Sequence, residues 1–346
     1  MKKKDKVLLG MSGGVDSAVS AILLQEQGYE VYGVTLKLWG QEKVEDAKKI
    51  CTKLGIEHYS IDAKKEFKEH VIDDFICKYK INQTPNPCIE CNKYLKFGYM
   101  YELAQKMGIQ YLATGHYAKM EYSEKYGRYV IKKAKNLAKD QSYVLYNMPK
   151  QLLGKVIFPL GEMESKEKIR KIARSYDLEV ANKPDSEDIC FIPDGDYKKF
   201  LEENSEIQPK NGKIVNTKGE VLGEHQGLYR YTIGQRKGLG IAYLEPLYVI
   251  GFNTDKNELI VGTENELYKN EMLVNNLNLL LVDEIPNPIK VMVKTRYSAK
   301  EYSAMIKMIE KDTIKVKFDN PVARITPGQS AVLYIEDMVL GGGKII

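Results

Sequence analysis

The fold of this chain is decided by one stretch near its N-terminus, Lys6-Val7-Leu8-Leu9-Gly10-Met11-Ser12-Gly13-Gly14-Val15-Asp16-Ser17. Val7 to Met11 form a short apolar run, which predicts a buried strand of a parallel sheet. A helical pattern begins at Val15 and stops at Gly28. A strand that leads through a glycine turn into a helix favours anion binding, because backbone N–H groups and the helix dipole meet at the turn.

The residues of this turn indicate a nucleotide phosphate site. Gly13 and Gly14 have no Cβ, so a phosphate can approach the backbone closely. Ser12 and Ser17 add hydroxyl donors, and Asp16 could hold a magnesium ion. The Gly-Lys-Ser/Thr ending of a Walker A loop is absent, which disfavours transfer of the γ-phosphate.

The hexapeptide Ser-Gly-Gly-Val-Asp-Ser at residues 12–17 resembles the PP-loop of ATP pyrophosphatases. This resemblance implies an enzyme that uses ATP with Mg²⁺, splits it into AMP and pyrophosphate, and adenylates a carbonyl oxygen. The alternative is an ordinary strand-to-helix turn that carries two glycines.

Strands and helices alternate along the first part of the chain. Strands are predicted at 30–38, 57–61 and 110–113, and helices at 44–54 and 62–80. This alternation predicts an α/β fold with a parallel sheet covered by helices on both faces. The ligand of such a sheet binds at the carboxyl ends of its strands, where residues 12–17 lie.

The sequence pattern changes past about residue 207, where short β-rich runs replace helical patterns. We therefore expect a catalytic PP-loop domain at 1–206, a small central β-rich domain that binds tRNA at 207–270, and a C-terminal antiparallel β-barrel at 271–346. Six strands are predicted in the barrel region: 277–282, 289–296, 302–309, 313–318, 330–335 and 341–346.

Composition predicts a cytoplasmic protein and allows an RNA partner. No apolar run reaches the roughly 18 residues of a membrane span, and the basic N-terminus precedes too short an apolar run for a secretory signal. The net charge is +5. A predicted hairpin within 119–140 carries seven Lys or Arg against three acids, interleaved with three tyrosines, which suits a nucleic acid. The alternative is a solvated hairpin.

The five cysteines divide into two groups. Structural disulfides are not expected in a reducing cytoplasm, and helical patterns predict that Cys51 and Cys77 are buried and inert. Pro85 and Pro87 predict an extended segment, after which a helix begins near Cys91. A thiol at a helix N-terminus has a lowered pKa, which favours its thiolate.

Several pieces together resemble one family, the bacterial tRNA-specific 2-thiouridylases (MnmA family). They follow the family's order and cover most of the chain. These pieces are Gly-Met-Ser-Gly-Gly-Val-Asp-Ser, Thr-Pro-Asn-Pro-Cys-Ile-Glu-Cys-Asn-Lys, Ala-Thr-Gly-His-Tyr-Ala, Lys-Asp-Gln-Ser-Tyr, Asp-Ile-Cys-Phe-Ile, Tyr-Thr-Ile-Gly-Gln-Arg-Lys-Gly-Leu-Gly, Arg-Tyr and Pro-Gly-Gln.

The resemblance implies a reaction in two stages. ATP adenylates the C2 oxygen of the wobble uridine U34 in tRNAs of the Glu, Gln and Lys type, and sulfur then displaces AMP to give 2-thiouridine. It also implies a sulfur-donating partner, such as a cysteine desulfurase or a relay protein.

The resemblance also implies roles for residues. Cys91 matches the family's nucleophile and Cys190 its persulfide carrier, while Asn86, Pro87 and Cys88 match the element that meets the target base. Leu36 stands where the family usually has Met. The ATP site would comprise Gly10, Met11, Ser12, Gly13, Gly14, Val15, Asp16, Ser17, Leu36 and Gly115, and the other tRNA contacts His116, Lys139, Asp140, Gln141, Arg296, Tyr297 and Gln329.

Cys88 departs from the family pattern, in which many members have aspartate. Together with Cys91 and Cys190, it could supply three thiolates to a [4Fe-4S] cluster whose open iron holds a hydrosulfide. A persulfide route without metal is the alternative. Zinc is a third reading, although a structural zinc wants four ligands.

Two other functions remain open at this stage. One is another PP-loop ligase or amidotransferase, which would adenylate a small substrate without needing Cys91 and Cys190. The other is a non-catalytic RNA-binding protein, against which the intact glycine turn and Asp16 argue.

Overall fold

The first part of the chain forms a five-stranded parallel sheet in the order β3-β2-β1-β4-β7. The computed structural model describes residues 4–40, 43–183 and 189–346. Because β1 lies between β2 and β4, the winding of the sheet reverses at β1, which is where such sheets bind ligands. The strands are β1 (Lys6–Gly10), β2 (Glu30–Lys37), β3 (Glu57–Asp62), β4 (Tyr111–Ala113) and β7 (Val156–Ile157).

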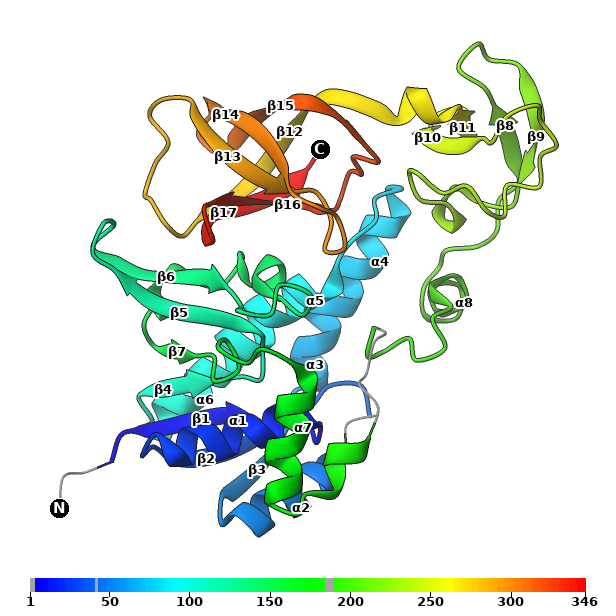
Figure 1. Cartoon of the computed structure of the whole chain (residues 1–346). Coiled ribbons are helices and arrows are strands. Elements are labelled where there is room, and N and C mark those ends of the chain that lie inside the picture. The colour runs from blue at the N-terminus through cyan, green and yellow to red at the C-terminus, as the bar shows by residue number, and fades with distance from the viewer. Residues whose placement is uncertain (1–3, 41–42, 184–188) are drawn as a thin grey trace.

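Helices cover both faces of this sheet, as the sequence predicts (Figure 1). Successive side chains of β1 point to opposite faces, so Val7 and Leu9 enter one core and Leu8 enters the other. The Val7 face packs on α1 (Val15–Glu26), α2 (Val44–Leu54) and α7 (Lys166–Ser175). The Leu8 face packs on α3 (Lys64–Phe67), η1 (Lys68–Ile72), α4 (Asp73–Lys80), α5 (Pro87–Glu90), η2 (Cys91–Tyr99) and α6 (Met100–Lys106).

The helix that carries Cys91 begins earlier than predicted. It starts at Pro87 as α5 and continues without a break through η2 and α6. Asn86 caps it by accepting a hydrogen bond from the Cys88 backbone N–H at 3.2 Å. Proline is well suited to the first helical position, where its missing N–H costs nothing. Cys91 therefore lies one turn inside the helix rather than at its start.

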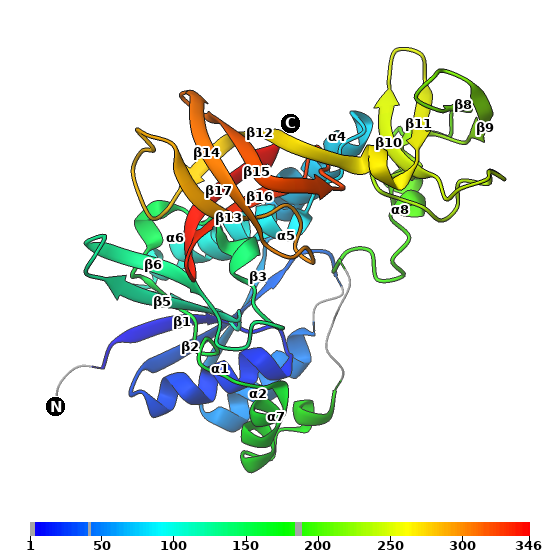
Figure 2. The same ribbon diagram turned by 45° about the horizontal axis from the view of Figure 1, so that its top comes forward.

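A small second sheet has the strand order β10-β11-β8-β9, and it projects away from the parallel sheet (Figures 1 and 2). Its own core is built around Ile214, Val249, Leu259 and Val261. Its elements are α8 (Tyr197–Asn204), β8 (Gly212–Val215), β9 (Val221–His225), η6 (Leu228–Arg230), β10 (Tyr248–Asn253) and β11 (Glu258–Gly262).

The last part of the chain is the predicted antiparallel barrel of six strands. Pairing of β12 with β17 closes it. Its first strand begins at Tyr268, earlier than expected. The elements are η7 (Glu264–Leu267), β12 (Tyr268–Leu279), β13 (Ile289–Lys294), β14 (Tyr302–Glu310), β15 (Thr313–Ala323), β16 (Ser330–Ile335) and β17 (Met338–Ile345).

The barrel is joined to the parallel-sheet region through a hairpin. The predicted hairpin is present as β5 (Ala118–Ser123) and β6 (Arg128–Lys133), and β6 bridges to β17 between Lys132 and Met338. Val332 and Tyr334 of the barrel enter the same core as Leu8. The remaining short helices are η3 (Ser142–Leu145), η4 (Lys150–Leu152) and η5 (Glu179–Asn182).

Among the described residues, no helix is both long and apolar enough to cross a membrane.

Candidate active site

The turn after β1 is shaped to accept a phosphate. Gly13 has φ +73°, and a Cβ there would lie 2.7 Å from the Lys43 carbonyl oxygen, so only glycine fits. Gly14 is the N-cap of α1, and no side chain caps the helix at that position. The first-turn N–H groups therefore keep their capacity for an anion, and the residues fit the phosphates of ATP.

The other predicted ATP residues lie around this turn. Leu36 is buried in β2, next to β1, and the Met11 N–H donates to the Val34 carbonyl at 2.7 Å. Gly115 follows β4 on the other side, and a Cβ there would lie 3.2 Å from the Ser17 nitrogen. Strands β1, β2 and β4 thus bring this set to one edge of the sheet.

Asp16 is held by two side chains that the sequence analysis did not single out. The Lys166 ammonium lies 2.8 Å from each carboxylate oxygen, and the Tyr117 hydroxyl donates to Oδ1 at 2.7 Å. Lys166 is 150 residues away in the chain and begins α7.

The pKa of Cys91 is raised, contrary to the sequence prediction. Burial raises it to about 12, with Lys96 opposing the shift and Cys190 and Cys88 adding to it. The thiol lies inside the helix, in a packed environment that disfavours charge. Cys91 and Phe191, the residue after Cys190, belong to the same buried core.

The other thiols differ in their surroundings. Cys190 and Cys88 are exposed. Surrounding protein atoms still shield the Cys88 sulfur from water, and this desolvation raises the pKa of Cys88. Cys51 is buried as predicted, but Cys77 is exposed, because α4 turns it away from the core. Within residues 4–40, 43–183 and 189–346, no three Cys, His, Asp or Glu side chains form a group that could hold a metal. As arranged here, the three cysteines do not fit a [4Fe-4S] cluster or a zinc site.

Cys190 is anchored by the residue that follows it. Phe191 is buried and makes edge-on contacts with Phe67, at 5.7 Å between ring centres, and with Phe75, at 5.4 Å. The Trp39 ring also packs against Phe191, with 6.4 Å between the ring centres. This aromatic packing anchors the chain at the exposed Cys190 to the core that also contains Cys91. The stretch 184–188 just before Cys190 lies outside the described residues.

The buried thiol leads to a pH-dependent prediction. At pH 7 to 8, iodoacetamide should modify Cys91 far more slowly than the exposed Cys77, because only about one Cys91 in ten thousand is a thiolate at pH 8. The Cys91 rate should rise about tenfold per pH unit up to pH 10. Peptide mass spectrometry of timed reactions measures both rates. Equal rates at pH 7 would contradict the buried state of Cys91.

The segment before Cys88 is held by the barrel. The Gln329 side-chain amide donates to the carbonyl oxygens of Thr84 at 2.7 Å and Pro85 at 3.3 Å. Arg296, Tyr297 and Gln329 line one pocket of about 180 Å³ together with Thr84. The predicted tRNA contacts of the barrel thus lie beside the predicted base-binding residues Asn86, Pro87 and Cys88.

The other predicted tRNA contacts are partly used inside the protein. Asp140 is buried and accepts from the Ala134 N–H at 2.9 Å, and the Gln141 side chain accepts from the Tyr117 N–H at 2.9 Å. His116 is buried, which lowers its pKa and keeps it neutral. Lys139 is exposed. Of these four residues, only the exposed Lys139 and the half-buried Gln141 have surface that a large ligand can contact.

An ion pair joins the cysteine helix to the barrel. Glu90 lies between the two thiols of Cys-x-x-Cys, and its carboxylate is 2.7 Å from the Lys344 ammonium of β17. Both side chains are nearly buried. Burial opposes the charge on Lys344, but Tyr146 and Glu90 outweigh it and raise its pKa. The barrel therefore helps to fix the position of Cys91.

The basic charge of the hairpin is largely balanced within the protein. Five of its seven Lys and Arg residues form ion pairs, which weakens the sequence argument for a bare RNA-binding patch. These pairs are Lys119–Glu162, Arg128–Asp283, Lys132–Glu121, Lys133–Glu301 and Lys135–Glu164.

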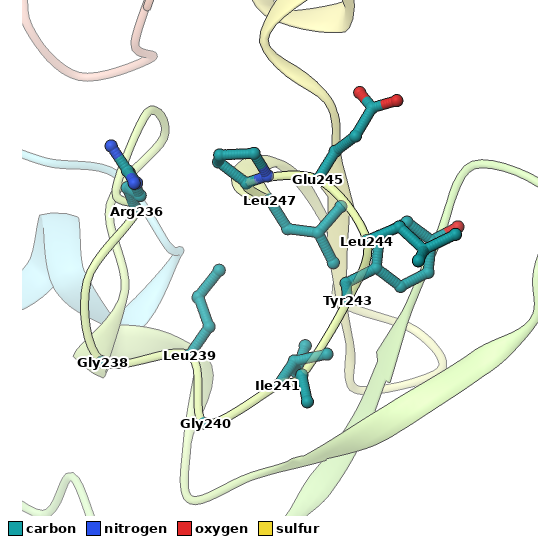
Figure 3. A pocket seen from close by; sticks show the side chains of 11 residues that line it. Arg236, Gly238, Leu239, Gly240, Ile241, Tyr243, Leu244, Glu245 and Leu247 are labelled. Atoms are coloured by element: carbon teal, nitrogen blue, oxygen red, sulfur yellow. The ribbon is translucent and has the colours of Figure 1, made fainter.

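Two cations in the loop between η6 and β10, next to the small second sheet, are not balanced by ion pairs of this kind within the part of the chain that the structure describes. Arg236 and Lys237 are exposed and form no ion pair with any residue that the structure describes. Arg236 lines an open hollow of about 630 Å³ (Figure 3), together with the exposed Tyr243 and Leu244. The hollow combines positive charge with an aromatic ring, as surfaces that bind nucleic acids do.

Comparison with known families matches nearly all of the chain in three parts. A family described as "tRNA methyl transferase HUP domain" matches residues 5–194. One described as "tRNA methyl transferase PRC-barrel domain" matches 198–263, and one described as "Aminomethyltransferase beta-barrel domain" matches 269–345.

Individual relatives match over nearly their full lengths. A protein of Caldanaerobacter subterraneus named "tRNA-specific 2-thiouridylase MnmA 2" is 46% identical over all of this chain and 99% of its own length. A Clostridioides difficile protein named "tRNA-specific 2-thiouridylase MnmA" is 45% identical, over 98% of each chain. Among solved structures, a 4-thiouridine synthetase in complex with RNA and ATP is 18% identical with a TM-score of 0.34, over 57% of this chain and 50% of its own.

Proposed function

Because this chain belongs to the tRNA-specific 2-thiouridylases of the MnmA family, we propose that it replaces the C2 oxygen of the wobble uridine U34 in tRNA by sulfur. The substrates are tRNAs of the Glu, Gln and Lys type, and the products are 2-thiouridine, AMP and pyrophosphate. We place the reaction in the cytoplasm, with a cysteine desulfurase or a relay protein as sulfur donor.

One observation supports this proposal: the helix that carries Cys91 packs against the segment after β4, which itself lies beside the phosphate-binding turn. His116 directly follows Gly115, and a Cβ on Gly115 would lie 3.2 Å from the Ser17 nitrogen. The ring of Phe97, in the helix of Cys91, lies 6.1 Å from that of His116. A base between the two elements can therefore meet both ATP and sulfur.

Adenylation is assigned to the turn after β1. Its backbone N–H groups bind the phosphates, and Asp16 is the residue that would hold Mg²⁺, which neutralises the charge of the leaving pyrophosphate. The uridine C2 oxygen attacks the α-phosphorus, and the bond to pyrophosphate breaks. The adenylate turns an oxygen that leaves poorly into one that departs as AMP.

Sulfur transfer is assigned to Cys190 and Cys91. The Cys190 persulfide attacks C2, and AMP departs with the electrons of the C2–O bond. The Cys91 thiolate then attacks the Cys190 sulfur, so that the S–S bond breaks and 2-thiouridine leaves with its electrons. The Cys91–Cys190 disulfide that remains is reduced by two cellular thiols, which form a disulfide in turn. Burial disfavours the Cys91 thiolate that this step needs, and Lys96 favours it.

We assign binding of the tRNA body to Arg236 and Lys237, in the loop between η6 and β10. In the variant Arg236→Ala/Lys237→Ala, we expect tRNA affinity to fall about tenfold and the salt slope of binding to shrink by about 2, because each cation releases one counterion. Filter binding over a series of salt concentrations measures both quantities. The matched control is Arg128→Ala/Lys132→Ala, whose cations are already paired. A larger loss in the control than in the first variant would contradict the assignment.

The function itself is tested by product analysis. The protein is incubated with ATP, a sulfur donor and unmodified tRNA, and the nucleosides and nucleotides are separated. We expect AMP, pyrophosphate and 2-thiouridine, all dependent on tRNA. ADP as the product would exclude the proposal, and AMP formation with a small acid in place of tRNA would favour a ligase or amidotransferase.

A further inference from the structure

The PP-loop of this chain has no lysine, but the fold delivers one to it from far away. The Ser165 hydroxyl caps α7 by accepting from the Lys168 N–H at 3.2 Å, so Lys166 occupies the first helical position. Helix α7 packs against α1 through Ile169 and Ala173. This packing places the Lys166 ammonium 2.8 Å from both oxygens of Asp16.

The Lys166–Asp16 ion pair is accessible to solvent and can separate when a ligand binds. The Lys166 side chain is 17% exposed and that of Asp16 is 32%, so water and ions reach the pair. The Tyr117 hydroxyl holds Oδ1 independently and would keep Asp16 oriented if Lys166 moved. An ion pair of this exposure contributes little to stability, so its separation is inexpensive when both partners find new charges.

The reaction supplies those new charges. Asp16 would hold Mg²⁺, and the β- and γ-phosphates of ATP would offer Lys166 an anion in its place. We propose that Lys166 is an ATP-site residue that leaves Asp16 when MgATP binds and then contacts the β- and γ-phosphates and the released pyrophosphate. This inference rests on the proposed ATP-dependent function of the same site.

The role of Lys166 differs from that of the lysine in a Walker A loop. It comes from a separate helix, and its approach depends on the α1–α7 contact. Since pyrophosphate leaves as a unit, a cation on the β- and γ-phosphates stabilises the leaving group in the step that forms the adenylate.

Nucleotide binding tests this proposal without tRNA. The affinity of Lys166→Met for ATP and for pyrophosphate, each with Mg²⁺, should fall at least about tenfold by calorimetry, while its affinity for AMP should stay unchanged. AMP lacks the two phosphates that Lys166 is proposed to contact. The matched control is Lys168→Met, on the same helix and paired with Glu164 at the surface, which should bind all three as the unchanged protein does.

Two results would overturn the proposal. Unchanged affinity for ATP and pyrophosphate would show that Lys166 stays on Asp16, and an equal loss for ATP and AMP would show a structural pair only. Should Lys166→Met fail to fold, as judged by thermal melting, Lys166→Arg provides the same comparison, because its guanidinium keeps the charge with a different reach. The assay contains no tRNA, so failure of tRNA thiolation and failure of this proposal are distinguishable.

Discussion

Replacement of Cys190 or of Cys91 by alanine is expected to lower tRNA thiolation at least about 1,000-fold, whereas Cys88→Ala should keep about half of it or more. In the persulfide route, one thiol carries the sulfur and the other breaks the S–S bond, so neither has a substitute. Cys88 is exposed and lies outside that exchange. Mass spectrometry of nucleosides from tRNA that was thiolated under nitrogen measures the effect.

The same series decides between the persulfide and a metal cluster. If Cys88→Ala loses activity as completely as the other two, three thiolates act as one unit, and a [4Fe-4S] cluster forms despite the arrangement described here. Cys77→Ala is the matched control, since it removes another exposed thiol from a helix of the same region. Adenylation, measured as tRNA-dependent AMP release, should survive all four substitutions, because the turn after β1 contains none of these residues.

Asp16→Asn should lower tRNA-dependent release of AMP and pyrophosphate at least about 100-fold. The amide keeps an oxygen that can accept from Tyr117 and from Lys166, so the local structure is retained. It loses the negative charge that would hold Mg²⁺. Radioactive ATP and chromatography of the products measure the rate.

A second measurement separates catalysis from folding in this variant. Thermal melting of Asp16→Asn should lie close to that of the unchanged protein, because the ion pair it alters is partly solvated. Asp73→Asn, which alters the surface pair with Lys68, is the control and should keep full activity. Full turnover of Asp16→Asn, or a melting temperature so low that the protein is unfolded in the assay, would defeat the assignment.

Local features of the fold were predictable from the sequence. The apolar run at Val7, the glycines of the turn and the helical spacing after Val15 act over a few residues, and the structure has them as expected. The six barrel strands also follow from short alternating runs between turns, although the first of them begins earlier, at Tyr268.

Features that depend on distant packing were not predictable. Pro85 and Pro87 suggested an extended segment, but Asn86 caps a helix that starts at Pro87. That shift moves Cys91 into the protein interior, where burial reverses the expected change in its pKa. The contact of Lys166 with Asp16 spans 150 residues and leaves no local pattern. The family resemblance pointed to the residues of the phosphate-binding turn and to the cysteines. It did not point to Lys166, Tyr117 or Lys344, whose contacts position them.

The ion pair between Glu90 and Lys344 bears on how the protein matures at the ribosome. Lys344 is synthesised 254 residues after Glu90, so a nascent chain carries the cysteine helix long before its counter-charge exists. A carboxylate without a partner resists entry into an apolar core. We therefore expect this helix to dock loosely on unfinished chains, and Cys88 and Cys91 to reach their final positions only after translation has passed β17.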